Sequence, residues 1–273
     1  MPIGSDLPLT QTTMLKPSLP PEIHDHIVDF LHYDTQALSQ CCLVSKSWIP
    51  RTRKHLFAIV LFGSPDDIHT WKEMFPDPSS SPAHYALTLK IRCFEVITVA
   101  DAAEGGWISA FSHVVSLDLD NGLEPLSVPF KTSFAPFYQF SPTLKNLCVA
   151  TFLLSLPQVF DLIHSLPLVE DLALHGTDTV IDDNERDGPE MIVSSPLSPK
   201  LTGSLIIFLF GGVAVTLRRL LGLPNGVHFR KIKLLWCKKV EDFRYLTELV
   251  VACSDTLEDL FVMGRLEGAV YLF

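Results

Sequence analysis

A short string of apolar residues recurs along the chain and constrains the fold more than any other feature. It consists of an apolar residue, two variable residues, a leucine, one variable residue and another apolar residue. Its central leucines are Leu89, Leu117, Leu147, Leu172, Leu205, Leu235 and Leu260, with one extra residue in the copy at Leu205. They are separated by 28, 30, 25, 33, 30 and 25 residues. Self-similarity of this kind predicts a repeat architecture.

Each copy predicts a short strand whose leucines point into a shared interior. Helical stretches at 157–166, 213–221 and 242–252 lie between copies. Strand alternating with helix at this period predicts an α/β solenoid over 85–273, with a parallel sheet on its concave face. The copies resemble long, irregular leucine-rich repeats, although they lack the regular Asn-bearing consensus. A doubly wound α/β domain is the alternative, disfavoured by the near-constant leucine spacing and the absence of a Gly-rich phosphate loop.

One uncharged segment has nearly the length of a membrane span. Residues 201–217 carry no charge for 17 residues, just under what a helix needs to cross a bilayer. The apolar run Ile206 to Phe210 ends at Gly211 and Gly212, which is typical of a buried strand followed by a turn. We therefore expect strand, turn and helix here, and no membrane partner.

The N-terminal part of the chain has a different pattern. Residues 1–17 are polar and lack periodicity, so we expect a flexible arm. Within 18–60, Ile23, Ile27, Phe30 and Leu31 fall on one helical face, and a second helical stretch runs from Leu38 to Trp48. These residues predict a helical domain too small to bury a large core by itself.

The segment LPPEIHDHIVDFLHYDTQALSQCCLVSKSWIPRTRKHLF resembles an F-box. The matching residues are Leu19, Pro20, Glu22, Ile23, Ile27, Leu31, Asp34, Leu38, Val44, Ser45, Lys46 and Trp48. His24 departs from the family pattern, which often has an aliphatic residue at that position. The match covers about 40 of the 273 residues. The alternative is an ordinary helical hairpin that packs on the rest of the chain.

The resemblance implies a partner, the Skp-type adaptor of cullin–RING ubiquitin ligases, and through it a cullin. The residues that it implies for adaptor binding are Leu19, Pro20, Ile23, Ile27, Leu31, Leu43, Val44 and Trp48. Irregular leucine-rich repeats often follow an F-box, so the family resemblance extends in a looser form to the rest of the chain.

Charge argues against nucleic acid as a partner. The chain has 21 Lys and Arg against 31 Asp and Glu, a net charge of −10, and phosphate backbones are bound by basic surfaces. Six cysteines without CxxC spacing are too sparse for a disulfide scaffold. With no glycosylation sequon and no signal-peptide pattern, we expect a cytoplasmic or nuclear protein.

Motifs for catalysis or cofactor binding are absent from the sequence. It contains no GxxxxGK[ST], GxGxxG, HExxH or GxSxG. His24, His26 and His32 lack the helical spacing that three metal ligands need. We expect no enzyme activity, no cofactor and no metal. A hydrolase hidden in an α/β domain is the weakest alternative, because no nucleophile–base motif appears.

Residues between the inward-pointing leucines are expected on the concave face, where a target protein would bind. The first four copies place small or polar residues there, whereas the last three place apolar ones. The predicted target-binding residues are Ile206, Phe208, Leu234, Trp236 and Phe261. Exposed apolar clusters mark binding sites. The alternative is that the final strands are covered on both faces.

Together these features predict the substrate-recognition subunit of an SCF-type ubiquitin ligase, with no chemistry of its own. An interaction scaffold built on repeats, whose F-box has no ligase partner, is the alternative function.

Overall fold

The computed structural model describes residues 20–120, 134–154, 156–179, 199–209, 211–266 and 269–272. The chain divides into two compact units, Met1–Leu56 (unit 1) and Phe57–Phe273 (unit 2). The predicted arm over 1–17 and Leu19, the first residue of the F-box-like segment, lie outside the described residues.

Unit 1 is helical, with α1 (Pro21–Phe30), α2 (Thr35–Val44), the 3-10 helix η1 (Lys46–Trp48) and α3 (Ile49–Leu56). Asp34 caps α2 by accepting a hydrogen bond of 2.9 Å from the backbone N–H of Ala37. The helical stretch expected from Leu38 to Trp48 is interrupted, because Ser45 has an extended backbone between α2 and η1.

The core of unit 1 is small. The side chains of Val28, Leu38, Cys41 and Thr52 are buried, one or two from each α-helix. The hydroxyl of Thr52 donates to the Trp48 carbonyl at 2.8 Å, so this polar group is satisfied inside the unit.

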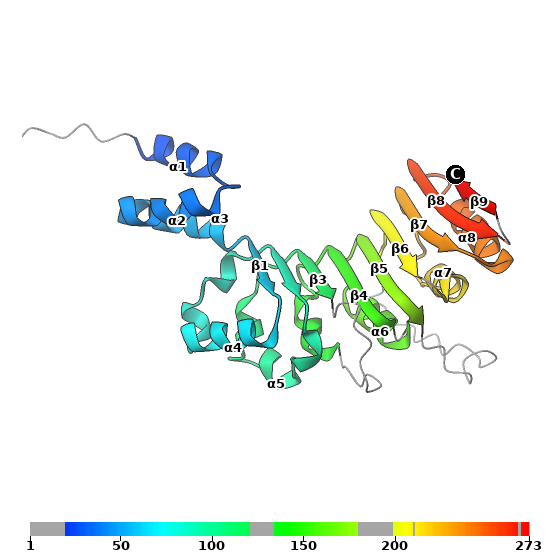
Figure 1. The fold of residues 1–273 in the computed structure, drawn as a ribbon, viewed down its shortest axis with the longest axis horizontal. Coiled ribbons are helices and arrows are strands. Elements are labelled where there is room, and N and C mark those ends of the chain that lie inside the picture. Colours follow the sequence, from blue (N-terminus) through cyan, green and yellow to red (C-terminus); the bar gives the residue numbers. More distant parts are fainter. Residues whose placement is uncertain are drawn as a thin grey trace, which may run out of the picture. The chain divides into compact units, whose positions relative to one another are not determined.

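Unit 2 is built on one nine-stranded sheet whose strands follow each other in sequence order (Figure 1). The strands are β1 (Ile59–Phe62), β2 (Thr88–Ile91), β3 (Ser116–Asp120), β4 (Asn146–Leu154), β5 (Asp171–Thr179), β6 (Ser204–Leu209), β7 (Lys231–Cys237), β8 (Asp259–Leu266) and β9 (Ala269–Leu272). All neighbouring pairs from β1 to β8 are parallel, and β9 pairs antiparallel with β8. An open α/β sheet in sequence order agrees with the predicted solenoid-like arrangement.

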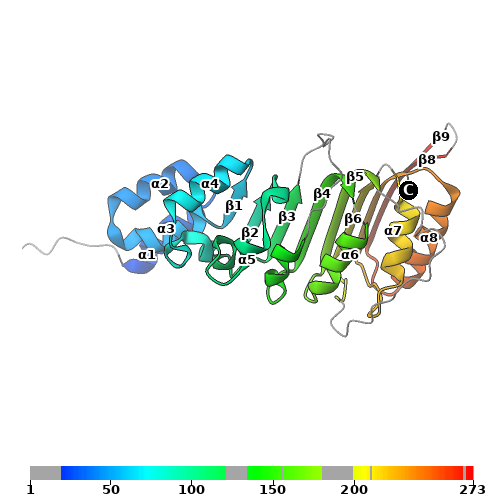
Figure 2. The same ribbon diagram turned by 90° about the horizontal axis from the view of Figure 1, so that it is seen from below.

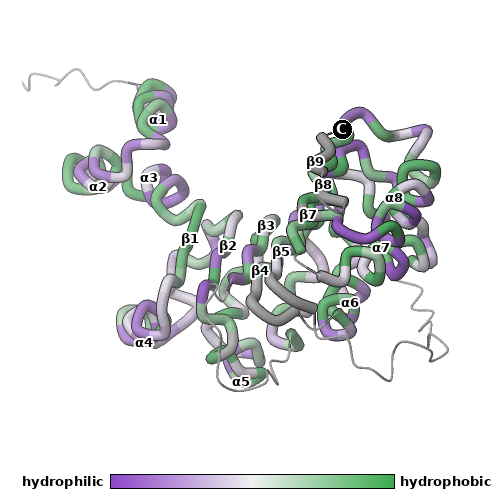
Figure 3. Tube along the Cα trace, turned by 45° about the vertical axis from the view of Figure 1, so that its right-hand side comes forward, coloured by the Kyte–Doolittle hydropathy of each residue, from purple (hydrophilic) through white to green (hydrophobic). Residues whose placement is uncertain are grey.

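Helical segments connect successive strands and cover one face of the sheet (Figure 2). They are α4 (Pro65–Met74), η2 (Pro78–Ser80), η3 (Pro82–Tyr85), η4 (Phe94–Val96), α5 (Val99–Ala102), η5 (Trp107–Ala110), η6 (Ala135–Phe140), α6 (Leu156–Ser165), α7 (Val213–Leu221) and α8 (Val240–Ala252). Within unit 2, the strands line the inner side of a curve and the helices its outer side (Figure 3). The sequence predicted α6, α7 and α8 to within two residues at either end.

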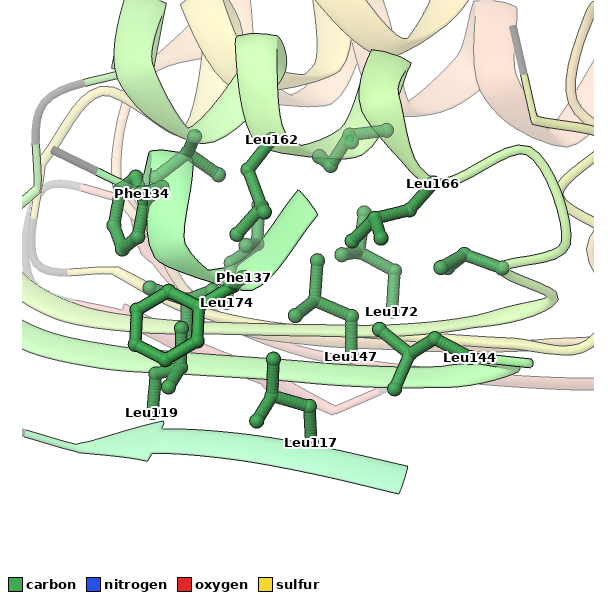
Figure 4. Close-up of a cluster of buried hydrophobic side chains, with 14 of the residues drawn as sticks. Leu117, Leu119, Phe134, Phe137, Leu144, Leu147, Leu162, Leu166, Leu172 and Leu174 are labelled. Atoms are coloured by element: carbon green, nitrogen blue, oxygen red, sulfur yellow. The ribbon is translucent and has the colours of Figure 1, made fainter. Parts of the chain in front are cut away.

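The core of unit 2 lies between the sheet and these helical segments. Alternate residues of each strand point into it because successive side chains of a strand face opposite sides. Figure 4 shows Leu117 and Leu119 of β3 and Leu147 of β4 pointing toward Leu162 and Leu166, and all five are at most 1% exposed. The repeated leucines therefore form one continuous core, as a stack of repeats requires.

Two copies of the repeat differ from the sequence prediction. In β7 the residue aligned with Leu205 and Leu260 is Ile232, so the sixth copy is centred there and not on Leu235. A further copy, Phe57-x-x-Val60-x-Phe62, precedes the predicted first one and forms β1. Its centre is a valine, so a search for central leucines misses it.

The uncharged segment 201–217 forms β6 and most of α7, as the Gly-Gly pair predicted. Leu205, Ile207 and Leu209 are buried at 0% exposure against the core. In the part of the chain that the structure describes, no helix has the length and apolar character needed to cross a bilayer.

Candidate protein-docking surfaces

Unit 1 leaves most of its F-box-like apolar residues at the surface. Ile23 and Ile27 of α1 are 43% and 38% exposed, and Leu43 and Val44 at the end of α2 are 87% and 68% exposed. Pro20 is also exposed, whereas Leu31 and Trp48 are half-buried. The core of unit 1 is formed by other residues, so its fold does not require burial of these side chains.

A charged network fixes α1 against α3 and so sets which face α1 presents. Arg51 donates to Asp29 through Nε at 2.7 Å and through an NH2 group at 2.5 Å, and His55 Nε2 lies 2.7 Å from the same carboxylate. The hydrogen bonds from Arg51 and then from His55 hold the pKa of Asp29 well below its usual range. The pKa of Arg51 is raised by the same pairing.

His24, the departure from the F-box pattern, has a packing role. Its ring lies 5.3 Å from the Trp48 ring, centroid to centroid, at a tilt of 53°. This contact links α1 to η1. The half-burial of Trp48 is thus partly due to a residue inside unit 1.

The second candidate surface is the sheet face of unit 2 that points away from the core. Strand register arranges its residues in rows that cross the sheet. One row runs through Leu61, Lys90, Asp118, Cys148, Ala173, Ile206, Lys233 and Phe261. The next runs through Asp120, Ala150, His175, Phe208, Leu235 and Met263.

The middle of this face is polar. Lys90 pairs with Asp118 at 3.3 Å across β2 and β3. Burial, helped by the neighbouring Asp118, raises the pKa of the Cys148 thiol to about 12, so it stays protonated and is a poor nucleophile. No group of three His, Cys, Asp or Glu residues suited to a metal ion occurs among the residues described.

The end of the face formed by β6, β7 and β8 is apolar. We call the residues Ile206, Phe208, Leu235, Phe261 and Met263 the apolar cluster. Phe261 is 39% exposed, and the other four are half-buried. Phe208 also lies beside His175 on β5, with 6.0 Å between ring centroids. Three predicted target-binding residues, Ile206, Phe208 and Phe261, are thus neighbours on one face.

Leu234 does not belong to this surface. The prediction placed it on the concave face, but its side chain is 0% exposed and lies in the core. The cause is the register of β7, which puts Ile232 and Leu234 inward and Lys233 and Leu235 outward. Trp236 lies in β7, but its side chain is outside the described part of the structure.

The sequence contained the signal that sets this register. In the β7 sequence KIKLLWC, Lys231 and Lys233 alternate with Ile232 and Leu234. Charged residues are almost never buried unpaired, so Lys231 and Lys233 mark the exposed face. That reading identifies Lys233 and Leu235 as surface residues, which the leucine-centred search missed.

A separate open cavity of about 550 Å³ lies at the edge of unit 2 where β6, β7 and β8 begin. It is lined by residues of both charges, Lys200, Thr202, His228, Arg230, Asp255, Thr256, Leu257 and Glu258. The hydroxyl of Thr256 donates to the backbone carbonyls of Phe229 and Cys253 at 3.2 Å each, which is a structural role.

Comparison with known proteins gives no match: no family model, no curated protein and no solved structure matches this chain.

Proposed function

We propose that this protein is the substrate-recognition subunit of an SCF-type cullin–RING ubiquitin ligase. In this proposal unit 1 is an F-box that docks a Skp-type adaptor, and unit 2 is a leucine-rich-repeat-like domain that holds a target protein. The resemblance of residues 19–57 to an F-box suggests the adaptor, and the curved sheet of unit 2 offers an extended face for a second protein.

One observation carries the proposal. The apolar residues that match the F-box pattern and the residues that hold unit 1 together are largely different sets. Leu38 belongs to both sets, but Val28 and Cys41 are buried outside the pattern, whereas the matching residues Ile23, Ile27 and Val44 are 43%, 38% and 68% exposed. Exposed apolar side chains concentrated on a small unit are typical of a protein interface.

The proposed role requires no chemistry from this chain. A conjugating enzyme recruited by the cullin carries the ubiquitin, and this protein raises the local concentration of target lysines near it.

Adaptor binding by purified full-length protein tests the first half of the proposal. Ile27→Asp places a carboxylate in the proposed interface, where desolvation costs several kcal/mol, and we expect loss of binding to a Skp-type adaptor. Val251→Asp is the matched control, because Val251 of α8 is 67% exposed and belongs to unit 2. Both variants should melt at the wild-type temperature.

The results distinguish a ligase subunit from an interaction scaffold. Adaptor binding that Ile27→Asp abolishes and Val251→Asp preserves supports the ligase role. A chain that binds a target protein but no Skp-type adaptor is a scaffold, and the ligase proposal is then wrong. Equal adaptor affinity for wild type and Ile27→Asp would refute the assigned docking residues.

A further inference from the structure

The register of β7 places a lysine within the apolar cluster. Lys233 lies opposite Ile206 on β6 and Phe261 on β8. Its Nζ lies 5.6 Å from the centre of the Phe261 ring, a cation–π arrangement. Along its own strand, the next outward residue is Leu235. Apolar side chains therefore border the ammonium group across the sheet and toward Leu235, whereas Lys231 and Asp259 form the next outward pair in the other direction.

Lys233 contacts an aromatic ring where Lys90 contacts a carboxylate. Lys90, at the other end of the same row, pairs with Asp118 at 3.3 Å, whereas no ion pair of Lys233 occurs among the described residues. Burial lowers the pKa of His175 and Lys233 opposes its protonation, although Asp118 and Asp120 act in the other direction.

We propose that Lys233 and the apolar cluster bind an acidic segment of the target protein. One Asp or Glu carboxylate of that segment pairs with Lys233, and flanking bulky apolar side chains pack on Phe208, Phe261 and their neighbours. This inference rests on the proposed function, since it specifies what the sheet face holds, and it identifies the chemistry of the target.

Charge complementarity selects a carboxylate over a phosphate. A single ammonium balances one carboxylate, whereas a phosphate carries nearly two negative charges and is usually bound by several arginines. Asp259 lies on the same face of β8, two residues before Phe261 and opposite Lys231, and repels a dianion more than a monoanion. A salt bridge bordered by apolar side chains is also stronger than one in open water.

The size of the cluster fits a short extended segment. Three adjacent strands span about 10 Å between the outer two, and alternate residues of one strand are about 7 Å apart. Alternate side chains of an extended peptide have that same spacing of about 7 Å. A segment with an acidic residue between two apolar residues, each two positions away, can therefore place all three on this surface.

Selection from a random peptide library tests the proposal. The library is unphosphorylated and is selected against the full-length protein without adaptor. We expect enrichment of sequences in which Asp or Glu is flanked by bulky apolar residues. The best peptide should bind Lys233→Glu at least about tenfold more weakly, and its affinity for the wild type should fall as salt rises.

Two variants distinguish specific binding at Lys233 from general electrostatic attraction of acidic peptides. Selection on Lys233→Glu should enrich Lys or Arg at the position of the former acid, because the charge partner is inverted. Lys231→Glu is the matched control, since Lys231 is exposed on the same strand one outward position away, and it should change affinity less than about threefold. Phe208→Ala should weaken binding of both peptide classes.

Failure of this inference is distinct from failure of the proposed function. If no acidic motif is enriched, or if Lys233→Glu selects the same sequences as the wild type, the inference is wrong. Adaptor binding is measured on the full-length protein through variants of unit 1 and remains an independent result. A peptide bound through Lys233 by a chain without adaptor affinity supports the inference and refutes the ligase role.

Discussion

The carboxylate of Asp171 on β5 binds Ser204 at the start of β6. Its Oδ1 accepts hydrogen bonds from the Ser204 backbone nitrogen at 2.5 Å and from the Ser204 hydroxyl at 2.7 Å. Gly203 makes the approach possible, because a Cβ there would overlap the Asp171 carboxyl group. The link joins two repeats separated along the chain by the long connection after β5.

Asp171→Ala should therefore destabilise the protein by about 1–3 kcal/mol, because charge-assisted hydrogen bonds to a half-buried carboxylate are lost. Gly203→Ala should lower stability as well, through steric overlap with Asp171. In the double variant the combined effect should be smaller than the sum of the two, since the shortened side chain at position 171 leaves room for the new methyl group. Chemical denaturation measures the unfolding free energies of the two single variants and the double variant. Strictly additive changes would contradict the proposed contact.

Asp242 connects the starts of two helices. Its side chain is 5% exposed and accepts hydrogen bonds from the backbone N–H groups of Lys238 and Lys239 at 2.9 Å each, before α8, and of Ala214 in α7 at 3.1 Å. Three backbone N–H groups thus depend on one buried carboxylate.

Asp242→Ala should lower the free energy of unfolding by about 2 kcal/mol or more, because buried donors lose their partner. Amide hydrogen exchange should show faster opening of both α7 and α8. Asp255→Ala, at a residue exposed beyond the end of α8, is the control. Loss of protection in α8 alone would mean that the Ala214 bond contributes little.

The lowered pKa of Asp29 predicts that the stability of unit 1 depends on pH. Its folded-state pKa lies below the ordinary value of 3.8 because Arg51 and His55 donate to it. A carboxyl group with a lowered folded pKa stabilises the fold above its unfolded pKa and loses that contribution as the pH falls through the folded value. The contribution of Asp29 is therefore complete at neutral pH and declines only below about pH 4.

Asn in place of Asp29 should weaken the hydrogen-exchange protection of α1 at neutral pH. The difference between variant and wild type should shrink toward about pH 3. Comparing both proteins at the same pH removes the effect of pH on intrinsic exchange. Asp25→Asn on the same helix is the control. A difference that grows as the pH falls would contradict the assigned direction of the shift.

The sequence predicted the elements of unit 2 better than it predicted which residues face outward. Helices α6 to α8 and strand β6 follow from hydrophobic period and from the Gly211–Gly212 pair. Strand β7 was ambiguous because Leu234, Leu235 and Trp236 are consecutive. A strand with adjacent apolar residues fits two registers, and a slip of one residue exchanges its faces.

For the docking surfaces, the sequence predicted which residues are apolar, but it predicted the exposure of only some of them correctly. Ile206 and Phe261 were placed on the outward face, where the structure has them, since each alternates with clear core residues. Lys233 was not predicted on the outward face, because the leucine-centred repeat gave β7 the other register and its neighbours Ile206 and Phe261 come from strands distant in sequence.

The register of β7 can be measured with two neighbouring leucines. Leu234 is 0% exposed within the core, whereas Leu235 is half-buried on the opposite face. Leu234→Ala removes buried methyl groups and leaves a cavity, so it should cost about 2–5 kcal/mol of unfolding free energy. Leu235→Ala removes the same atoms from a partly solvated face and should cost less than about 1 kcal/mol. Because the two substitutions are chemically identical, their difference in chemical denaturation reports only on position. The leucine-centred repeat predicts the opposite order, and a larger effect at Leu235 would restore that register and remove Lys233 from the exposed face.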